Sequence, residues 1–198
     1  MNRRPGWFQG ARSRVVLTVF VCGMCSATVF AWKSDSKSTD WVALTPQIES
    51  ALGKQYSDCD ENSRGIDILK TADIGVPVAI VAYCHMGAYT SETTVVWLKD
   101  GKPVLAKFRD HGKIVQPEML EGSSAENGTG VELYPDQHAV LSVAWRSDEV
   151  GKLSECHGTA YAWNPAARTF DAHNALSKEL STKECARVAE DVNKPAAQ

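Results

Sequence analysis

Two cysteine–histidine pairs are the residues of this sequence best suited to chemistry. Cys84 and His85 stand in YCHMG, and Cys156 and His157 stand in ECHGT. Such a pair can supply a thiolate nucleophile with its base, or two ligands for a zinc ion. Alternatively, each cysteine belongs to a disulfide and the adjacent histidine has no part in it. The three interpretations place different demands on the strands that carry the pairs.

The nucleophile interpretation meets a geometric obstacle. Consecutive residues of a strand point to opposite faces of the sheet, so His85 is poorly placed to activate Cys84, and His157 to activate Cys156. Disulfide formation would also consume both thiols. The chain contains no G-x-S-x-G, Walker A or Rossmann glycine pattern. We therefore predict no catalytic residue.

A metal site requires the two strands to be neighbours in register. His85 and His157 would then project from one face, and His138, His111 or a carboxylate would complete the ligand set. The spacing matches neither H-E-x-x-H nor the C-x-x-C-H of a c-type haem. We predict no metal and no cofactor, and keep His85, His138 and His157 as the residues of an alternative, metal-dependent enzyme.

The N-terminus has the organisation of a secretory signal peptide. Residues 1–14 contain four arginines and no acid, and residues 15–31 contain no charge. A basic region, an apolar region and a final small residue predict a leader over 1–31, cleaved after Ala31. The apolar run is short of the about 20 residues of a typical membrane span, and an uncleaved anchor is the alternative. Either way the domain is predicted on the non-cytoplasmic side, secreted or periplasmic or membrane-anchored.

The remaining cysteines predict two disulfides. Cleavage would remove Cys22 and Cys25, and four cysteines would be left in an oxidising compartment. Three connectivities are possible. We favour Cys59–Cys84 with Cys156–Cys185, because each bond would tie a terminal segment to a nearby strand.

The charge of the exported chain argues against nucleic-acid binding. Removing a leader with four arginines and no acid changes the formal net charge from −3 to −7. Phosphate backbones would repel such a domain, and no cluster of lysine or arginine offsets this.

Asn127-Gly128-Thr129 matches the acceptor pattern for N-glycosylation.

Composition divides the exported part into three segments. Residues 32–44 are polar and predict a spacer, residues 45–192 predict one domain, and residues 193–198 predict a frayed tail. The domain opens with a predicted helix, capped by Thr45 with Pro46 at its first position and stopped by Gly53.

A period of two dominates from Gly65 to Phe170 and predicts strands. Residues 76–84 are apolar on both faces, as in a central strand. Asp100-Gly101 predicts a hairpin, which places Trp97 opposite Val104 and Val96 opposite Leu105. Both faces of this hairpin are apolar, so both must be covered by other parts of the chain.

Later segments continue the pattern. Residues 121–130 predict a loop, residues 135–137 a second hairpin turn, and residues 156–171 a third hairpin. Small residues at the even positions 156–162 predict that one face of this strand packs closely against another element. A C-terminal helix follows, with Ser181 and Glu184 as a capping box, and Cys185 would tie it to the sheet.

Together these features predict an α+β fold, mainly an antiparallel meander of seven or eight strands in a curved sheet or sandwich. We predict a non-catalytic module that binds a protein or an envelope component, through loops such as 121–130 or 110–118. The alternative is an exported hydrolase or metal-dependent enzyme, which requires at least two of the candidate histidines and an acid in one pocket. A structural envelope protein with an uncleaved leader would keep Met1 as its N-terminus rather than Trp32.

Overall fold

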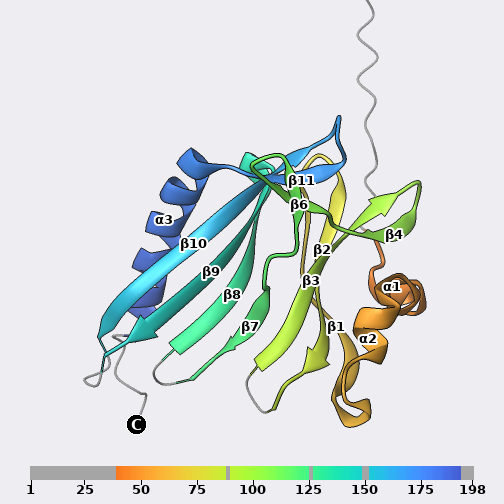
Figure 1. Cartoon of the computed structure of the whole chain (residues 1–198), viewed down its shortest axis with the longest axis horizontal. Coiled ribbons are helices and arrows are strands. Elements are labelled where there is room, and N and C mark those ends of the chain that lie inside the picture. Colours follow the sequence, from red (N-terminus) through yellow and green to blue (C-terminus); the bar gives the residue numbers. More distant parts are fainter. Residues whose placement is uncertain (1–38, 88–89, 125–126, 149–151, 193–198) are drawn as a thin grey trace, which may run out of the picture. The chain divides into compact units, whose positions relative to one another are not determined.

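The strands of this chain form one curved sheet with helices on its outer face (Figure 1). The computed structural model describes residues 39–87, 90–124, 127–148 and 152–192, so the predicted leader and tail lie outside the described residues. The helices are α1 (Thr45–Leu52), α2 (Lys54–Ser57) and α3 (Asn174–Val192), with 3-10 turns at Val42–Leu44, Glu61–Ser63 and Pro135–Gln137. The strands are β1 (Arg64–Asp73), β2 (Pro77–His85), β3 (Thr90–Lys99), β4 (Lys102–Leu105), β5 (Phe108–Asp110), β6 (Lys113–Val115), β7 (Leu120–Ser123), β8 (Asn127–Tyr134), β9 (Ala139–Ser147), β10 (Leu153–Asn164) and β11 (Thr169–Ala172).

The sheet is mainly antiparallel, and its order departs from a simple meander. The strands follow the order β1-β2-β3-β7-β8-β9-β10-β11-β5-β6, and β4 pairs with β3 beside this path. Only the pair β5–β11 is parallel among the described strands. The predicted α+β class and antiparallel character are confirmed. The described strands number 11 rather than seven or eight, because the segment between β3 and β7 leaves the meander and returns.

The hairpin β3–β4 has the register that its turn residues predict. Trp97 pairs with Val104 and Val96 with Leu105. Asp100 has φ 52° and Gly101 has φ 75°, and two positive φ angles are what a type I′ turn requires. Two residues of the turn thus set the alignment of both strands.

A continuous segment closes the sheet into a ring of hydrogen-bonded strands. After β4, the Ala106 amide still donates to Val95 O on β3 (2.8 Å). One residue later, Lys107 O accepts from the Phe170 amide on β11 (2.8 Å). The chain therefore leaves β3 and bonds to β11, which lies far from β3 in the strand order, within two residues, and the sheet encloses an inner core.

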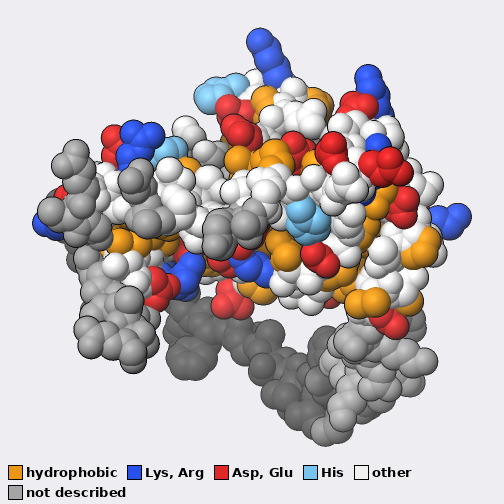
Figure 2. All heavy atoms as spheres, turned by 90° about the horizontal axis from the view of Figure 1, so that it is seen from below, with side chains coloured by type: hydrophobic (Ala, Val, Ile, Leu, Met, Phe, Trp, Pro, Cys, Tyr) orange, Lys and Arg blue, Asp and Glu red, His pale blue; other side chains and the backbone are white. Residues whose placement is uncertain are grey.

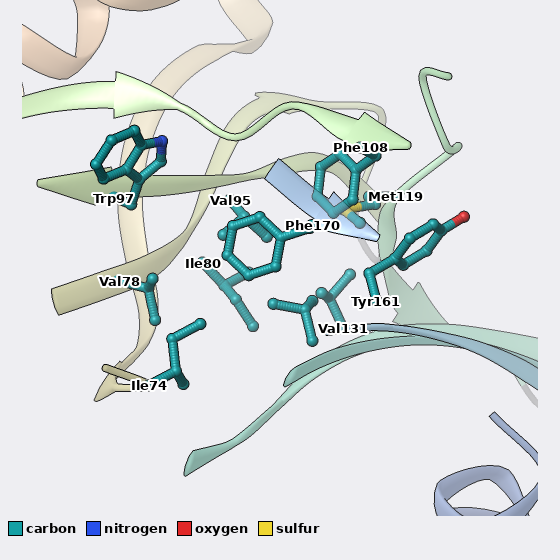
Figure 3. Packing of buried hydrophobic residues seen from close by; sticks show 11 residues of the cluster. Ile74, Val78, Ile80, Val95, Trp97, Phe108, Met119, Val131, Tyr161 and Phe170 are labelled. Carbon is teal, nitrogen blue, oxygen red and sulfur yellow. The ribbon is translucent and has the colours of Figure 1, made fainter. Parts of the chain in front are cut away.

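The inner core combines aromatic and aliphatic side chains (Figure 3). Phe170 is fully buried, and its ring lies 5.5 Å from that of Phe108 and 5.1 Å from that of Trp163, measured between centroids. Val78, Ile80, Val95, Val131 and Val140 complete the aliphatic part. The burial of these side chains is the main favourable contribution to the stability of this part of the fold.

Helix α1 covers the outer face of β2 and β3. Its buried Ile48 and Leu52 belong to a cluster with Val81 and Val96 of the sheet, which explains why β2 is apolar on both faces. The helix begins at Thr45 and ends before Gly53, near its predicted bounds, but Thr45 is helical and no side chain caps the helix. Trp41 is buried in the same cluster, so the folded part includes the end of the predicted spacer.

Helix α3 covers the other outer region, over β9 and β10 (Figure 1). Leu180 is fully buried against Leu141 and Ala160, and the disulfide Cys156–Cys185 ties the helix to β10 as predicted. The close packing predicted from small residues is confirmed, because a Cβ on Gly158 would lie 3.1 Å from Ser181 Oγ and 2.9 Å from a Leu141 methyl.

Two serines of α3 also satisfy the backbone of β10 beyond its pairing with β11. Ser177 Oγ accepts from the Ala160 amide (2.8 Å), and Ser181 Oγ donates to Gly158 O (3.0 Å). An exposed strand edge would otherwise leave these groups to water or to another chain. The helix therefore protects this edge with side-chain hydrogen bonds.

The predicted capping box at Ser181 and Glu184 is wrong. The helix begins at Asn174, and His173 Nδ1 accepts from the Leu176 amide at its first turn (3.2 Å). Glu184 is buried and accepts from Tyr134 Oη (3.3 Å) and from Arg187 Nε (2.9 Å). Ser181 and Glu184 therefore bond to the sheet and to other residues of the helix, and they do not cap its N-terminus. No helix among the described residues is long and apolar enough to cross a membrane.

The predicted loop at 121–130 is wrong as well, because β7 and the start of β8 occupy most of it. Gly128 pairs with Trp145 of β9, and a Cβ there would overlap the indole ring. Glycine at this position permits close packing under an aromatic ring. The composition of residues 121–130 had resembled that of a loop. Asn127 is exposed at the first position of β8, and its glycosylation stays a prediction.

The parallel pair β5–β11 that closes the ring is fastened by a carboxylate. Asp171 accepts from Arg109 Nε (2.9 Å) and Nη2, from Thr169 Oγ1 (2.7 Å) and from Asn164 Nδ2 (2.8 Å). The hydrogen bonds from Arg109 foremost, then those from Asn164 and Thr169, lower the pKa of Asp171 from 3.8 to about 2. The folded state therefore favours the ionised carboxylate.

Because this pKa is lowered on folding, its contribution to stability is complete above about pH 4 and is lost as the pH falls toward 2. We expect Asp171→Asn to lower the free energy of unfolding by about 1 kcal/mol at pH 7, a value that allows for the partial exposure of the pair. The difference between the two proteins should shrink below pH 4. Urea unfolding at pH 7, 4 and 2.5 measures it, and a difference that is constant with pH would contradict this role.

Candidate functional site

The structure does not bring the three candidate histidines together. His85 lies on β2 and His157 on β10, and β3, β7, β8 and β9 stand between these strands in the sheet. His138 lies at the turn between β8 and β9, with Nδ1 close to Gly75. Within the described ranges, no three His, Cys, Asp or Glu side chains are grouped so that they could hold a metal ion.

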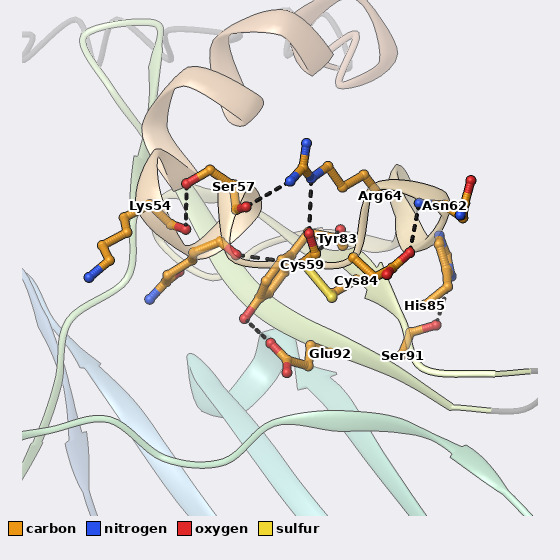
Figure 4. The surroundings of a disulfide bond; sticks show 12 residues. Lys54, Ser57, Cys59, Asn62, Arg64, Tyr83, Cys84, His85, Ser91 and Glu92 are labelled. Carbon is orange, nitrogen blue, oxygen red and sulfur yellow. Dashed lines mark hydrogen bonds between the residues drawn. A yellow bond between two sulfur atoms is a disulfide. The ribbon is translucent and has the colours of Figure 1, made fainter.

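The imidazole of His85 has local partners. Its Nδ1 lies 2.9 Å from Ser91 Oγ (Figure 4), and its Nε2 lies 3.4 Å from Asp67 Oδ2. His111 is exposed at the turn between β5 and β6, with Nδ1 2.8 Å from Asp110 Oδ1. His85 and His111 therefore have polar partners at a strand end and at a turn, respectively.

Both disulfides have the connectivity favoured from the sequence, Cys59–Cys84 and Cys156–Cys185. The four sulfur atoms are therefore neither nucleophiles nor metal ligands. Around the first disulfide, Arg64 donates to Cys59 O (3.1 Å) and Ser57 O (2.7 Å), which fixes the segment between α2 and β1 (Figure 4). The bond joins this segment to β2 directly beside Tyr83.

A cavity lies where β3 changes its pairing partner. Residues Thr90–Glu92 pair with β7, whereas Val96–Lys99 pair with β4. Between them, the segment Gln116–Met119, which we call the strap, runs from β6 to β7, and its Met119 O accepts from the Thr93 amide (2.9 Å). The divergence of β4 from the strap leaves a cavity of about 660 Å³.

Hydrophobic side chains line the outer part of this cavity. Ile114 of β6 is 64% exposed and Met86, after β2, is 46% exposed. The other large hydrophobic residues exposed in the described part of the chain are Val42 and Leu69, and neither lines the cavity. Exposed apolar side chains beside a concave surface are a feature of binding sites.

Polar residues also line the cavity. Tyr83 Oη donates to Glu92 Oε2 (2.8 Å, Figure 4), and burial, followed by this carboxylate, raises the pKa of Tyr83. Thr93 is 5% exposed, and its Oγ1 is the only buried side-chain nitrogen or oxygen atom of the described residues without a hydrogen-bond partner. Lys107 and Glu118 also line the cavity and are exposed.

A second cavity, of about 370 Å³, lies on the other side of the strap. Its walls carry the hydroxyls of Thr129, Ser142, Thr159 and Tyr161, together with the imidazole of His157 and the carboxylate of Glu118. In the described residues no hydrogen bond joins His157 to either Ser142 or Glu118, so the base–nucleophile contact of a hydrolase is not formed. Pro117, Glu118 and Leu120 line both cavities.

The sequence pointed to a segment that lines this cavity, 110–118, but did not predict the cavity itself. The predicted presenting loop at 110–118 contains β6 and three of the four residues of the strap, and its binding of a partner stays a prediction. That prediction rested on the general use of loops for binding, and nothing in the local pattern of β3 shows where its pairing partner changes. Comparison of the chain with protein-family models, with curated proteins and with solved structures found no match.

Proposed function

We propose that this chain is an exported, non-catalytic module that binds a segment of a partner protein in the cavity beside the strap. The observation that carries this proposal is the position of Ile114 and Met86, which leave apolar surface exposed at the cavity beside the strap. A partner side chain that enters there would remove this surface from water. Fully burying one such side chain contributes about 1.5–3 kcal/mol.

Export is supported by the cysteines. Both pairs are oxidised in the structure, and disulfides persist outside the cytoplasm. A rigid, covalently tied scaffold suits a binding module, because preorganisation lowers the entropy lost on association. The leader over residues 1–31 and a secreted or periplasmic location belong to this proposal.

Surface charge favours a partner that is not strongly acidic. On the side shown in Figure 2, acidic side chains spread across the middle of the described surface, with hydrophobic side chains exposed between them. Most lysine and arginine side chains on that side lie nearer its margins. Complementary charge accelerates association and excludes wrong partners.

The enzyme alternative loses its main support. It requires two of the candidate histidines beside an acid, and of the three only His157 lines either cavity beside the strap. The thiols that a cysteine nucleophile needs are oxidised.

A random peptide library displayed on phage, selected on the oxidised exported chain, tests the proposal. We expect enriched peptides to share an apolar residue, and Ile114→Glu to weaken their binding about 10-fold or more, because a carboxylate would replace the apolar contact. Fluorescence anisotropy with the synthetic peptides measures the affinities.

Val42→Glu is the matched control. Val42 is 73% exposed and does not line the cavity, so this variant introduces the same charge in place of an exposed hydrophobic residue elsewhere. We expect it to bind as the wild type does. Peptides that bind the Ile114→Glu variant with unchanged affinity, or that lose affinity equally for both variants, would place the binding surface outside the cavity.

A further inference from the structure

The inner face of β8, β9 and β10 changes from apolar to polar along the strands. Residues directly opposite each other in an antiparallel pair share a face of the sheet, so the register defines rows across these three strands. One row belongs to the inner core or packs against it: Leu133, Val140 and Tyr161. The next two rows are Val131–Ser142–Thr159 and Thr129–Ala144–His157. Hydroxyl and imidazole groups thus replace core side chains where the second cavity separates this face from the strap.

The polar side chains of this cavity are available to a ligand. Among the described residues, no hydrogen bond or ion pair is formed by the side chains of Glu118, Thr129, Ser142, His157, Thr159 and Tyr161, and none of their polar atoms is both buried and unpartnered. Water therefore reaches these groups in the free chain. A ligand that displaces this water has to replace its hydrogen bonds.

Tyr161 supplies a donor at the boundary between the core and the cavity. The residue is 7% exposed, and its ring lies 5.0 Å from that of Phe108, measured between centroids. Figure 3 shows its hydroxyl directed away from the labelled core side chains. Burial, followed by the carboxylate of Asp110, raises the pKa of Tyr161. The phenol therefore keeps its proton at neutral pH and can donate.

The inventory of groups disfavours several kinds of ligand. Within the described residues no lysine or arginine lines this cavity and Glu118 is its one carboxylate, so an anion such as phosphate finds no firm counter-charge. One carboxylate is also too few to hold a metal cation. An apolar ligand would remove water from the hydroxyls without replacing its hydrogen bonds. A neutral ligand with several groups that both donate and accept matches the cavity best.

We infer that the second cavity binds the neutral ring of a saccharide, and that Ser142, Thr159 and Glu118 bond to its hydroxyls. A sugar hydroxyl donates and accepts, as serine and threonine hydroxyls do, and a carboxylate accepts from it in a stronger, charge-assisted bond. The volume of about 370 Å³ lies within the range of small-molecule sites, about 300–1,000 Å³. Pro117 and Leu120 add apolar surface for the C–H groups of the ring. This site is separate from the peptide site and does not rest on it.

Titration of saccharides into the isotope-labelled, oxidised exported chain, followed by NMR, tests this inference. From a panel of glucose, galactose, mannose, N-acetylglucosamine and their disaccharides, we expect at least one to shift the amide signals of Ser142 and Thr159. Inorganic phosphate at the same concentration should not shift them. Ser142→Ala and Thr159→Val should each weaken binding of that saccharide about 5-fold, because each removes one hydrogen bond. Glu118→Gln should weaken it about 10-fold, because the charge-assisted bond is lost.

Thr71→Val is the matched control for Thr159→Val. Both threonines are exposed on strands, and Thr71, on β1, lines neither cavity beside the strap. We expect this variant to bind the saccharide as the wild type does. Ile114→Glu should also leave saccharide binding unchanged, because Ile114 does not line the second cavity, so the peptide site and the saccharide site can fail separately. Thermal unfolding shows that each variant is folded.

The source of the sugar follows from a comparison of chain lengths. Equal affinity for a saccharide and for its polymer would indicate a free sugar, and tighter binding of the polymer would indicate one unit of a longer glycan. The inference is overturned if no member of the panel shifts the signals of Ser142 and Thr159, or if phosphate shifts them instead. Equal weakening by Thr71→Val and Thr159→Val would also overturn it, because the binding surface would then lie elsewhere.

Discussion

Replacing Cys156 and Cys185 together by alanine is expected to lower the free energy of unfolding by about 3 kcal/mol. The disulfide joins residues 29 positions apart, and a cross-link of this span restricts the unfolded chain. It also holds α3 over the outer face of β10, where Leu180 covers Leu141 and Ala160. The Tm should fall by about 6–12 °C, as measured by thermal unfolding followed by circular dichroism without reductant.

The pair Cys59 and Cys84 offers a matched control, because its span is 25 residues. Its replacement by two alanines should cost a similar free energy but affect a different region. Hydrogen exchange should accelerate in α3 when Cys156–Cys185 is removed, and between α2 and β1 when Cys59–Cys84 is removed. A variant without Cys156 and Cys185 that unfolds at the wild-type urea concentration would show that α3 is held by its noncovalent contacts alone.

Gly158→Ala is expected to destabilise the chain by about 2 kcal/mol through overpacking. The added Cβ would lie 2.9 Å from Leu141 Cδ1, 3.0 Å from Ser142 O and 3.1 Å from Ser181 Oγ. The carbonyl belongs to the backbone of β9, so it cannot yield by a change of rotamer. Relief requires β10 to shift relative to both β9 and α3, which strains the β9–β10 pairing and weakens the hydrogen bond from Ser181 to Gly158 O. Urea unfolding measures the loss.

Gly130→Ala on β8 is the control for this substitution. There the nearest atoms to a new Cβ are Val143 Cγ1 at 3.6 Å and Glu121 Oε2 at 3.7 Å, which are ordinary contacts. We expect a change within about 0.5 kcal/mol of the wild type. Equal destabilisation by the two alanines would mean that β propensity at a strand glycine, and not the approach of α3, governs both effects.

The peptide experiments and the stability experiments concern separate surfaces of one scaffold. Gly158 and Cys185 hold α3 on the outer face, whereas Thr93 and Ile114 belong to the cavity where β3 changes partners. The stability variants should therefore alter peptide binding little under conditions in which they remain folded.

Features that depend on neighbouring residues were predictable from the sequence. The Asp100-Gly101 turn fixes the register of β3 with β4, because only residues that tolerate positive φ support a two-residue hairpin. Apolar residues on both faces of β2 indicate that both are covered, and the inner core and α1 do cover them. Four cysteines beyond the predicted leader indicated two disulfides, and the preference for bonds that tie a terminal segment to a nearby strand gave the pairing that the structure has.

Features that depend on contacts distant in sequence were not predictable. Ser181 and Glu184 have the spacing of a helix cap, yet Gly158 O and Tyr134 Oη bond to them instead. Gly128 looked like part of a loop. It is required because the indole of Trp145, on another strand, leaves no room for a Cβ.

The sequence by itself determined which segments are strands around tight turns, which faces are apolar and how many disulfides can form, because backbone preferences and alternation act over a few residues. Only the tertiary structure decided that the chain leaves β3 at Ala106 and joins β11 at Lys107. The cavity beside the strap exists because of that change of partners. Strand pairing between distant segments is a competition among whole alternatives, settled by the total burial and hydrogen bonding of the fold. The site is thus a product of topology, and no local motif records it.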